Sequence, residues 1–149
     1  MRRDRGFTLI ELLIVVAIIG IVAAIAIPNL INAINKGRQK RTMADMRTIA
    51  SAIGEYATDN NYYPRSQTTM GTLYSFVNPF YIKISVTEDG WRTPYNVSSD
   101  PIGDSYSLIS AGKNKAFETF TGGTTQNFDC DIHHVNGSFT QWPDGTQQD

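Results

Sequence analysis

Hydrophobic positions form one long uninterrupted run near the start of the chain. Between residues 7 and 27 the only charged residue is Glu11. A run of about 20 apolar residues is long enough to cross a bilayer as a helix. Because the bilayer core offers the backbone no water, such a span must satisfy its hydrogen bonds internally. The pattern therefore predicts a membrane-spanning helix over residues 7–27.

After Pro28 the run gives way to a periodic pattern. Proline removes a helical hydrogen bond and introduces a kink, which membrane helices tolerate. Apolar residues then follow the i, i+3, i+4, i+7 spacing of an amphipathic helix. The stripe consists of Met46, Ile49, Ala50, Ile53, Tyr56 and Ala57. We therefore predict one helix over residues 7–58, roughly 75–80 Å long, whose second half buries this face against a folded head.

The head is predicted to occupy residues 59–149. A short helical turn is expected at residues 72–77. Alternation of apolar and polar residues predicts a strand or an extended connector at 81–86 and a strand at 105–110. Residues 119–127 are rich in Thr and Gly and are expected to form an exposed loop.

A hairpin is predicted near the C-terminus, with arms at residues 128–135 and 138–142. Asn136-Gly137 joins the arms, because this pair supplies the positive φ angles of a type I′ turn. Pro143 is expected to end the second arm. The fold class predicted is α+β, a long N-terminal helix packed on a small antiparallel sheet.

The single cysteine, Cys130, rules out an internal disulfide. It is expected to be a small buried residue, on the same strand face as Phe128 and Ile132. The neighbouring residues Asp129, Asp131 and His133 would then lie on the opposite face.

Net charge gives no sign of a nucleic-acid partner. The chain has 13 basic and 14 acidic residues. Removing residues 1–6 takes away three of the basic and one of the acidic residues, which leaves a net charge of −3. Binding to nucleic acid normally requires a strong basic excess. We therefore expect no nucleic acid among the partners.

Glu11 is the informative exception within the apolar run. A carboxylate near the start of a span costs about 1–3 kcal/mol, depending on depth. No Lys or Arg lies within the span to pair with it. The expectation is that its partner comes from outside this helix, or that its side chain reaches the headgroup region.

The segment Gly6-Phe7-Thr8-Leu9-Ile10-Glu11-Leu12, after a basic leader, resembles the class III signal of type IV pilins and type II secretion pseudopilins. The resemblance implies that a prepilin peptidase cleaves after Gly6 and methylates the new N-terminus, Phe7. It also implies that Glu11 pairs with the N-terminal amine of a neighbouring subunit during assembly. An ordinary secretory signal cut after Ala26, or an uncleaved anchor, would explain the apolar run but not Gly6 or Glu11.

Two features favour the pseudopilin branch. Residues 88–95 resemble the Asp-x-Trp-Gly-x-Pro-Tyr segment of major pseudopilins, with Arg92 in place of the usual Gly. They are expected to form a turn that anchors the rings of Trp91 and Tyr95 in the core. Many pilins carry a C-terminal disulfide loop, which this chain cannot form. The resemblance implies a structural subunit of the pseudopilus of a type II secretion system. The alternative is a type IV pilus subunit, major or minor, acting in adhesion, motility or DNA uptake.

The same resemblance implies partners and a location. The partners are further copies of the chain, minor pilins or pseudopilins, the prepilin peptidase, the inner-membrane assembly platform, and membrane lipid before assembly. The chain is expected to cross the bacterial inner membrane once, with its N-terminus cytoplasmic and its head periplasmic. It would then enter a periplasmic or cell-surface filament.

A loop after residue 110 is the candidate cation site, because the corresponding loop of relatives helps bind calcium. Calcium takes six to eight oxygen ligands. The candidates here are Ser110, Asn114, Asp129 and Asp131. Lys113 and Lys115 would oppose a dication, and a solvated turn is the alternative.

Catalysis is not expected. Adjacent residues His133 and His134 point to opposite faces of a strand, and His133 with a neighbouring Asp gives too few ligands for structural zinc. No nucleophile–base pattern or cofactor motif is present. A membrane-tethered binding module that uses the loop at residues 119–127 stays open as another class of function.

Overall fold

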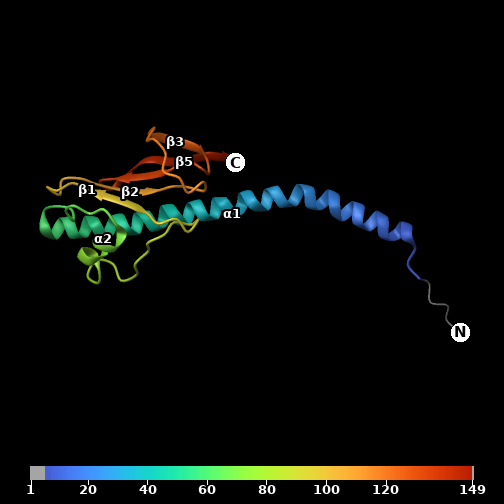
Figure 1. Cartoon of the computed structure of the whole chain (residues 1–149), viewed down its shortest axis with the longest axis horizontal. Coiled ribbons are helices and arrows are strands. Elements are labelled where there is room, and N and C mark those ends of the chain that lie inside the picture. Colours follow the sequence, from blue (N-terminus) through green and yellow to red (C-terminus); the bar gives the residue numbers. More distant parts are fainter. Residues whose placement is uncertain (1–5, 149) are drawn as a thin grey trace. The chain divides into compact units, whose positions relative to one another are not determined.

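The computed structural model describes residues 6–148 (Figure 1). Residues 1–5, which make up most of the predicted leader, lie outside this part. The chain divides into two compact units, one ending at Ile34 and the other beginning at Asn35. From here on the head means this second unit, which includes the second half of the long helix as well as the segment predicted as the head.

One long helix, α1 (Leu9–Asn60), contributes to both units. Its bounds confirm the predicted helix over residues 7–58 to within two residues at each end. The helix continues through Pro28. Among the described residues, α1 is the one helix long and apolar enough to cross a membrane.

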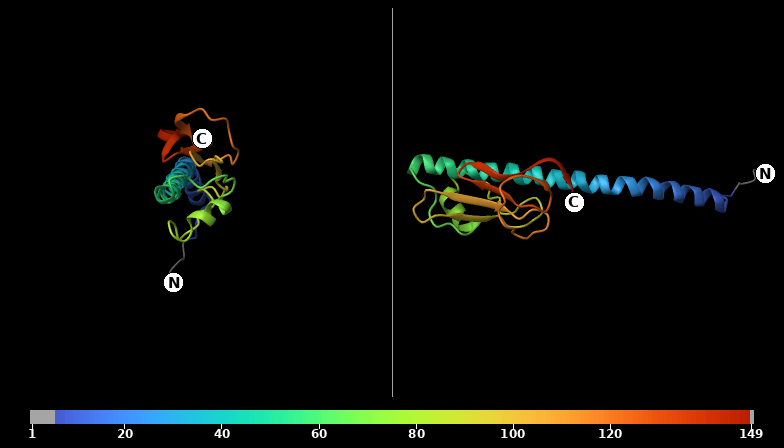
Figure 2. Two further views of the ribbon diagram at one scale, coloured as in Figure 1. Left: turned by 90° about the vertical axis from the view of Figure 1, so that its left-hand side faces the viewer. Right: turned by 90° about the horizontal axis from the view of Figure 1, so that it is seen from above.

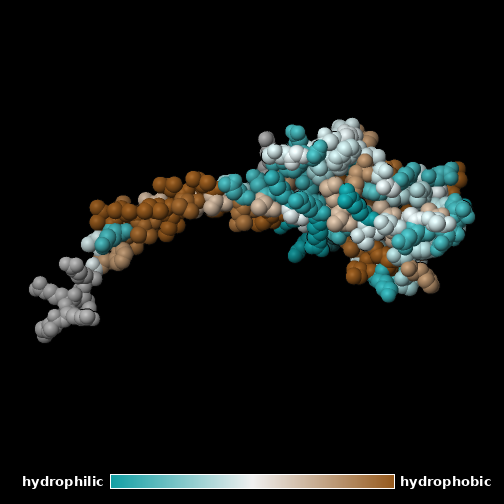
Figure 3. Space-filling view, turned by 180° about the vertical axis from the view of Figure 1, so that it is seen from behind, coloured by the Kyte–Doolittle hydropathy of each residue, from teal (hydrophilic) through white to brown (hydrophobic). Residues whose placement is uncertain are grey.

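In the first unit the apolar side chains are exposed, and this part of α1 appears as a brown surface in Figure 3. The exposure extends beyond the predicted span, to Leu30, Ile31 and Ile34. A contiguous apolar surface of this kind indicates a membrane or a protein partner. Residues 7–34 are therefore suited to lipid or to a bundle of neighbouring helices.

The head has its own hydrophobic core, built on the predicted stripe of α1. Met46, Ile49 and Ile53 are fully buried, whereas the residues predicted to lie off the stripe, Arg47, Ser51 and Glu55, are exposed. The stripe packs against α2 (Met70–Val77) and the sheet. Figure 2 shows both beside the second half of α1. The prediction of a short helix near residues 72–77 is confirmed, with a start two residues earlier.

The sheet has five strands, β1 (Asn96–Ser99), β2 (Tyr106–Ser110), β3 (Gly123–Asn127), β4 (Ile132–Val135) and β5 (Ser138–Gln148). Their spatial order is β1-β2-β4-β5-β3. Three pairs are antiparallel, but β3 and β5 are parallel. The α+β class is confirmed, and the sheet is mixed rather than wholly antiparallel.

Strands β3 and β5 each differ from what the sequence predicts. Residues 119–127 are not all loop, because Gly123–Asn127 pairs with β5. Pro143 does not end the second hairpin arm either, since β5 continues through it to Gln148. Proline is tolerated there because β4 pairs with β5 only as far as Gln141, so the next residues of β5 have a strand on one side only.

The hairpin turn is confirmed in its position and its backbone geometry. Asn136 and Gly137 join β4 to β5 with φ angles of 49° and 87°, the positive values that a type I′ turn needs. The Asn136 side-chain oxygen accepts a hydrogen bond from the Tyr106 backbone N–H at 2.9 Å, which ties the turn to β2.

Residues 81–86 form the connector, not the strand, of the two predicted alternatives. The backbone N–H groups of Tyr81 and Ile82 both donate to the Val77 carbonyl at the end of α2. The Val86 N–H donates to the Tyr74 hydroxyl at 2.8 Å. This segment therefore folds back onto α2, and its backbone groups are bonded there rather than to a strand.

The turn at residues 88–95 holds its two aromatic anchors as predicted. Trp91 and Tyr95 are both buried. One carboxylate oxygen of buried Asp89 accepts hydrogen bonds from the Trp91 and Thr93 N–H groups, each at 2.9 Å. Cys130, in contrast, was expected to be buried and is only half-buried. It lies in a turn before β4, in which the Cys130 N–H donates to the Asn127 carbonyl.

Candidate functional site

The predicted cleavage site lies ahead of α1. Gly6, Phe7 and Thr8 are exposed and are in neither helix nor strand. A Cβ atom added to Gly6 would meet nothing within 4 Å. The Gly6–Phe7 bond is therefore accessible on the chain, and nothing in the described fold requires glycine there.

Thr8 and Glu11 form a reciprocal cap at the start of α1. The Thr8 carbonyl accepts the first helical hydrogen bond, from the Leu12 N–H at 3.3 Å. The Thr8 N–H and hydroxyl donate to Glu11 Oε2 at 2.8 and 2.7 Å. In return, the Glu11 N–H donates to Thr8 Oγ1 at 3.3 Å. This is the capping box in which a Thr and a Glu three residues later satisfy two otherwise unpaired backbone donors.

The cap gives Glu11 hydrogen-bond partners within its own chain. A charged partner from outside the helix, or a side chain that reaches the headgroup region, stays a prediction. Thr8 supplies donors locally, which matters because unpaired backbone N–H groups are costly near a bilayer. The signal for this cap is present in the sequence as Thr-x-x-Glu immediately before an apolar run. Both hydrogen bonds from Thr8 reach Oε2, so neither occupies Oε1.

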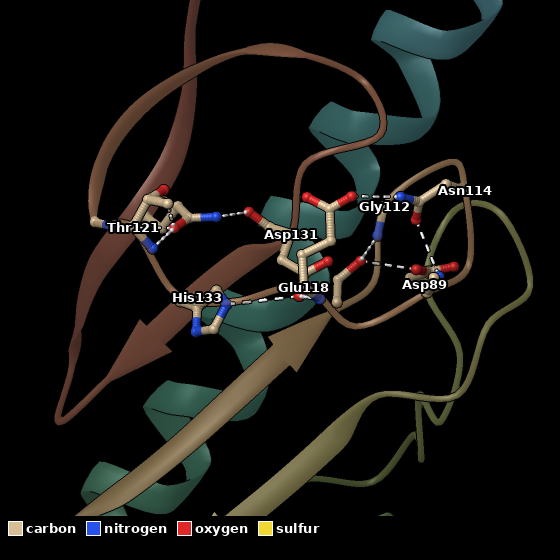
Figure 4. A network of polar contacts seen from close by, with 11 residues as sticks. Asp89, Gly112, Asn114, Glu118, Thr121, Asp131 and His133 are labelled. Atoms are coloured by element: carbon tan, nitrogen blue, oxygen red, sulfur yellow. Dashed lines mark hydrogen bonds and ion pairs between the residues drawn. The ribbon is translucent and has the colours of Figure 1, made fainter.

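A second polar site lies where β2 ends, and Figure 4 shows its contacts. The Ser110 hydroxyl is fully buried and donates to Asp89 Oδ2 at 2.7 Å. Gly112 follows with a φ of +65°, and a Cβ atom there would lie 2.8 Å from the carbonyl oxygens of Asp129 and Cys130. Only glycine therefore lets the chain turn this close to the segment before β4.

The loop from Gly112 to Gly122 is fastened at two points. Asp131, almost fully buried, accepts a hydrogen bond from the Glu118 N–H through Oδ2 at 2.9 Å. Buried Gln141 accepts from the Thr121 N–H, the Thr121 hydroxyl and the Gly122 N–H at 3.0–3.1 Å. The Gln141 amide in turn donates to the Asp131 carbonyl at 2.9 Å. Side chains of β5 and of the residue before β4 thus close the loop (Figure 4).

Burial sets the ionisation of the groups beneath this loop. Burial raises the pKa of the Asp131 carboxyl, partly offset by the hydrogen bond from Glu118. Burial lowers the pKa of His133, although Asp131 acts in the opposite direction. Their nearest N···O distance is 3.7 Å. Asp131 Oδ1 and His133 Nε2 are buried without a hydrogen-bond partner among the described residues.

The calcium candidates do not form a ready site as they are arranged. The Ser110 hydroxyl bonds to Asp89. Asp131 Oδ2 accepts from the Glu118 N–H, which leaves only Oδ1 of this carboxylate without a partner among the described residues. The exposed Asn114 caps its own turn, with its oxygen accepting from the Ala116 N–H and its amide donating to Glu118. Asp129 is half-buried. Within residues 6–148, no three His, Cys, Asp or Glu side chains are grouped to hold a metal ion. The arrangement does not fit the oxygen-rich shell that calcium needs.

His133 and His134 have different neighbours. The His133 ring lies 5.0 Å from that of Phe120, whereas the His134 ring packs against Phe139 at 4.8 Å and stacks on Tyr106 at 6.2 Å. The two imidazoles therefore have separate packing roles, as expected for adjacent residues on a strand.

These observations define a class of protein. The predicted cleavage site precedes a helix whose first half has an exposed apolar surface, suited to a membrane anchor. The second half of that helix packs against a small mixed sheet, and this α+β fold is pilin-like. Residues 1–27 match the prokaryotic N-terminal methylation motif. Residues 29–132 match the family described as type II secretion system (T2SS), protein G. That match covers more than half of the chain, which therefore belongs to the type II secretion protein G family.

Curated relatives agree with this assignment. The type II secretion system core protein G of Dickeya chrysanthemi is 31% identical over 124 residues, which cover 82% of this chain and 78% of the relative. Its counterpart in Klebsiella pneumoniae is 30% identical over 125 residues, 83% of this chain and 86% of the relative. The Vibrio cholerae protein is 32% identical over 126 residues, 83% and 82% of the two chains. No solved structure gives a significant match.

Proposed function

We propose that this chain is the repeating structural subunit of the pseudopilus of a type II protein secretion system. The observation that carries the proposal is the exposed apolar surface of residues 7–34 on a chain whose residues 29–132 match protein G. Such a surface requires lipid in the free subunit and other helices in a filament. Relatives named core protein G match this chain over most of their length. The role is structural, and the proposal includes no catalytic step.

Processing would prepare the subunit for assembly. A prepilin peptidase would cleave between Gly6 and Phe7 and methylate the Phe7 amine. The methylation motif and the exposure of both residues support this step. Before assembly, the first half of α1 would hold the subunit in the inner membrane, with the N-terminus in the cytoplasm and the head in the periplasm.

Assembly would move this half of α1 from lipid into a bundle formed by other copies. Glu11 Oε1, which Thr8 leaves unoccupied, would then accept the methylated Phe7 amine of a neighbouring copy. An ion pair is stronger in a low-dielectric bundle than in water, and an offset copy would leave Glu11 without that amine. Charge pairing would therefore set the axial register. Minor pseudopilins and the inner-membrane assembly platform are the further partners proposed.

The test is deletion of the gene in the bacterium that encodes the chain, followed by complementation. Secretion of the exoproteins of its type II system should stop and should return with the intact gene. Overproduction should give filaments that react with antibody to the head. Normal secretion together with loss of surface pili or of twitching would overturn the proposal and assign the chain to a type IV pilus.

A further inference from the structure

Basic residues gather immediately after the apolar part of α1. The basic collar consists of Lys36, Arg38, Lys40 and Arg41, which are all exposed. It holds four of the ten Lys and Arg residues that follow Gly6, and no acidic residue occurs between Glu11 and Asp45. The rest of the head is acidic overall. The collar is thus a local positive surface on a chain that would carry a net negative charge after cleavage.

Position along α1 places the collar at a membrane surface. The charge-free stretch from Leu12 to Ile34 would be roughly 35 Å long at 1.5 Å per residue. The hydrocarbon core of a bilayer is about 30 Å thick. Residues that follow Ile34 therefore fall at the depth of the lipid headgroups. Lys and Arg side chains are suited to this depth, because their apolar stems lie along hydrocarbon while their charged ends reach the headgroups.

A groove within the head adds a defined place for an anion. Lys36 and Lys40, one helical turn apart, line a groove of about 340 Å³ together with Gln39, Met43 and residues of β5. Among residues 6–148, no ion pair joins either lysine to a carboxylate. Asp144 also lines the groove, and its Oδ1 accepts a hydrogen bond from the Gly145 N–H at 2.8 Å.

Buried side chains keep the walls of this groove together. Gln39 and Gln147 are both almost fully buried. The Gln39 amide donates to Gln147 Oε1 at 3.3 Å, and the Gln147 amide donates to the carbonyls of Thr125 and Asp144 at 2.8 and 2.9 Å. These hydrogen bonds hold β5 against α1, so the residues of β5 that line the groove are fixed in position opposite the two lysines.

We propose that the basic collar binds the headgroups of anionic phospholipids in the membrane leaflet nearest the head, with a lipid phosphate received between Lys36 and Lys40. Basic residues next to a span attract anionic lipid through charge, within about one Debye length of the surface. The proposal rests on membrane anchoring of the free subunit. It adds an energetic consequence, since each subunit must leave these lipids when it enters a filament.

The test uses the full chain in detergent micelles with equal amounts of an anionic phosphatidylglycerol, POPG, and a zwitterionic phosphatidylcholine, POPC. Native mass spectrometry counts the lipid molecules that the protein retains. The wild type should retain POPG in preference to POPC. The double variant Lys36→Gln, Lys40→Gln should lose this selectivity by about tenfold or more. The control Lys83→Gln, Lys115→Gln removes the same charge from two exposed lysines outside the collar, and it should keep the wild-type ratio.

Three outcomes would overturn the proposal. Equal retention of POPG and POPC by the wild type, or equal loss in both double variants, would show that the collar does not select anionic lipid. Displacement of POPG by millimolar inorganic phosphate would show a free-phosphate site instead. Binding of a short DNA duplex at 0.15 M salt, lost in the collar variant and without POPG selectivity, would assign the surface to nucleic acid. None of these outcomes depends on filament assembly. A negative result for lipid binding would therefore leave the proposed function untouched, because the deletion and complementation experiment tests that function separately.

Discussion

Thr8 and Glu11 hold each other at the first turn of α1, through a 2.8 Å bond from the Thr8 N–H and a 3.3 Å bond from the Glu11 N–H. Glu11 thus has two separable properties, its hydrogen bonds within its own helix and its charge. The cap explains how the helix can begin at the edge of a membrane, where backbone donors need partners. The charge is then available for the proposed pairing with a neighbouring Phe7 amine.

Glu11→Gln separates these two properties. Gln occupies the same place in capping boxes, so the variant should be helical, membrane-bound and processed normally. Breaking a buried ion pair costs about 3–5 kcal/mol, so filament yield should fall about tenfold or more. Electron microscopy and a shearing assay would measure that yield. Glu11→Val, which loses both cap and charge, should be no better, and wild-type yield from Glu11→Gln would refute pairing with the Phe7 amine.

Gly6→Glu tests the cleavage site. The space around Gly6 is open, so the substitution should leave the fold intact and block only the peptidase. Intact mass of the membrane-extracted chain should show that residues 1–6 are retained and that Phe7 is unmethylated. Gly20→Ala is the matched control, because a Cβ atom there also meets nothing within 4 Å, and it should be cleaved and methylated. A chain that starts after Ala26 in the wild type would mean ordinary secretion instead.

Gln141→Ala should loosen the loop from Gly112 to Gly122. It would leave the Thr121 and Gly122 N–H groups without the acceptor they now share. Thr121 is exposed, so its N–H can bond to water, whereas Gly122 is half-buried, and a buried donor left unsatisfied costs about 1–3 kcal/mol. Denaturant unfolding of the full chain in detergent should show a loss in this range. Gln126→Ala, at an exposed position on β3, should change stability by less than about 0.5 kcal/mol. Equal losses in the two variants would contradict the role of Gln141.

Calcium should not stabilise the head, because the Ser110 hydroxyl already bonds to Asp89 and Asp131 Oδ2 to Glu118, which leaves Asp131 Oδ1 as the one oxygen of these two side chains without a partner among the described residues. A site with a Kd of about 10 μM would add about 2.7 kcal/mol at 100-fold excess calcium. Thermal unfolding with millimolar calcium and with EDTA would reveal such an effect readily. A calcium-dependent rise in Tm that Asp131→Asn abolishes would show that the loop rearranges around the ion after all.

Local patterns account for the features that were predicted correctly. The helix follows from a 3.6-residue period that Met46, Ile49 and Ile53 continue, and the hairpin turn follows from the backbone needs of Asn136-Gly137. Both signals act over a few residues. The reciprocal cap of Thr8 and Glu11 is equally local, because its Thr-x-x-Glu pattern spans only four residues.

Long-range pairing accounts for the errors. Strand β3 is polar and rich in Thr, and it becomes a strand only because β5, far along the chain, pairs beside it. Nothing near Gln141 in sequence indicates that its side chain holds a loop some 20 residues earlier. Such contacts depend on the completed fold.

Acidification should destabilise the head through its two buried histidines. Burial lowers the pKa of His134, and the charge of Arg47 adds to this effect. Burial also lowers the pKa of His133. A histidine whose folded pKa lies below its ordinary value near 6.5 contributes stability above that value, and the contribution is lost as pH falls toward the folded pKa. Asp131 opposes this effect, because its raised pKa means that the folded head takes up this proton at a pH above the ordinary value of 3.8.

The free energy of unfolding should therefore fall between pH 7.5 and pH 5, by at most about 1.4 kcal/mol per pH unit for each histidine. His134→Gln removes one titrating group and should flatten this decline, although it also lowers stability at pH 7.5 through lost packing on Phe139. The slope, rather than the absolute stability, is thus the deciding quantity. Urea unfolding of the full chain in detergent at several pH values would measure it. An unchanged slope in both His133→Gln and His134→Gln would mean that the two imidazoles titrate in the folded head as they do in the unfolded chain.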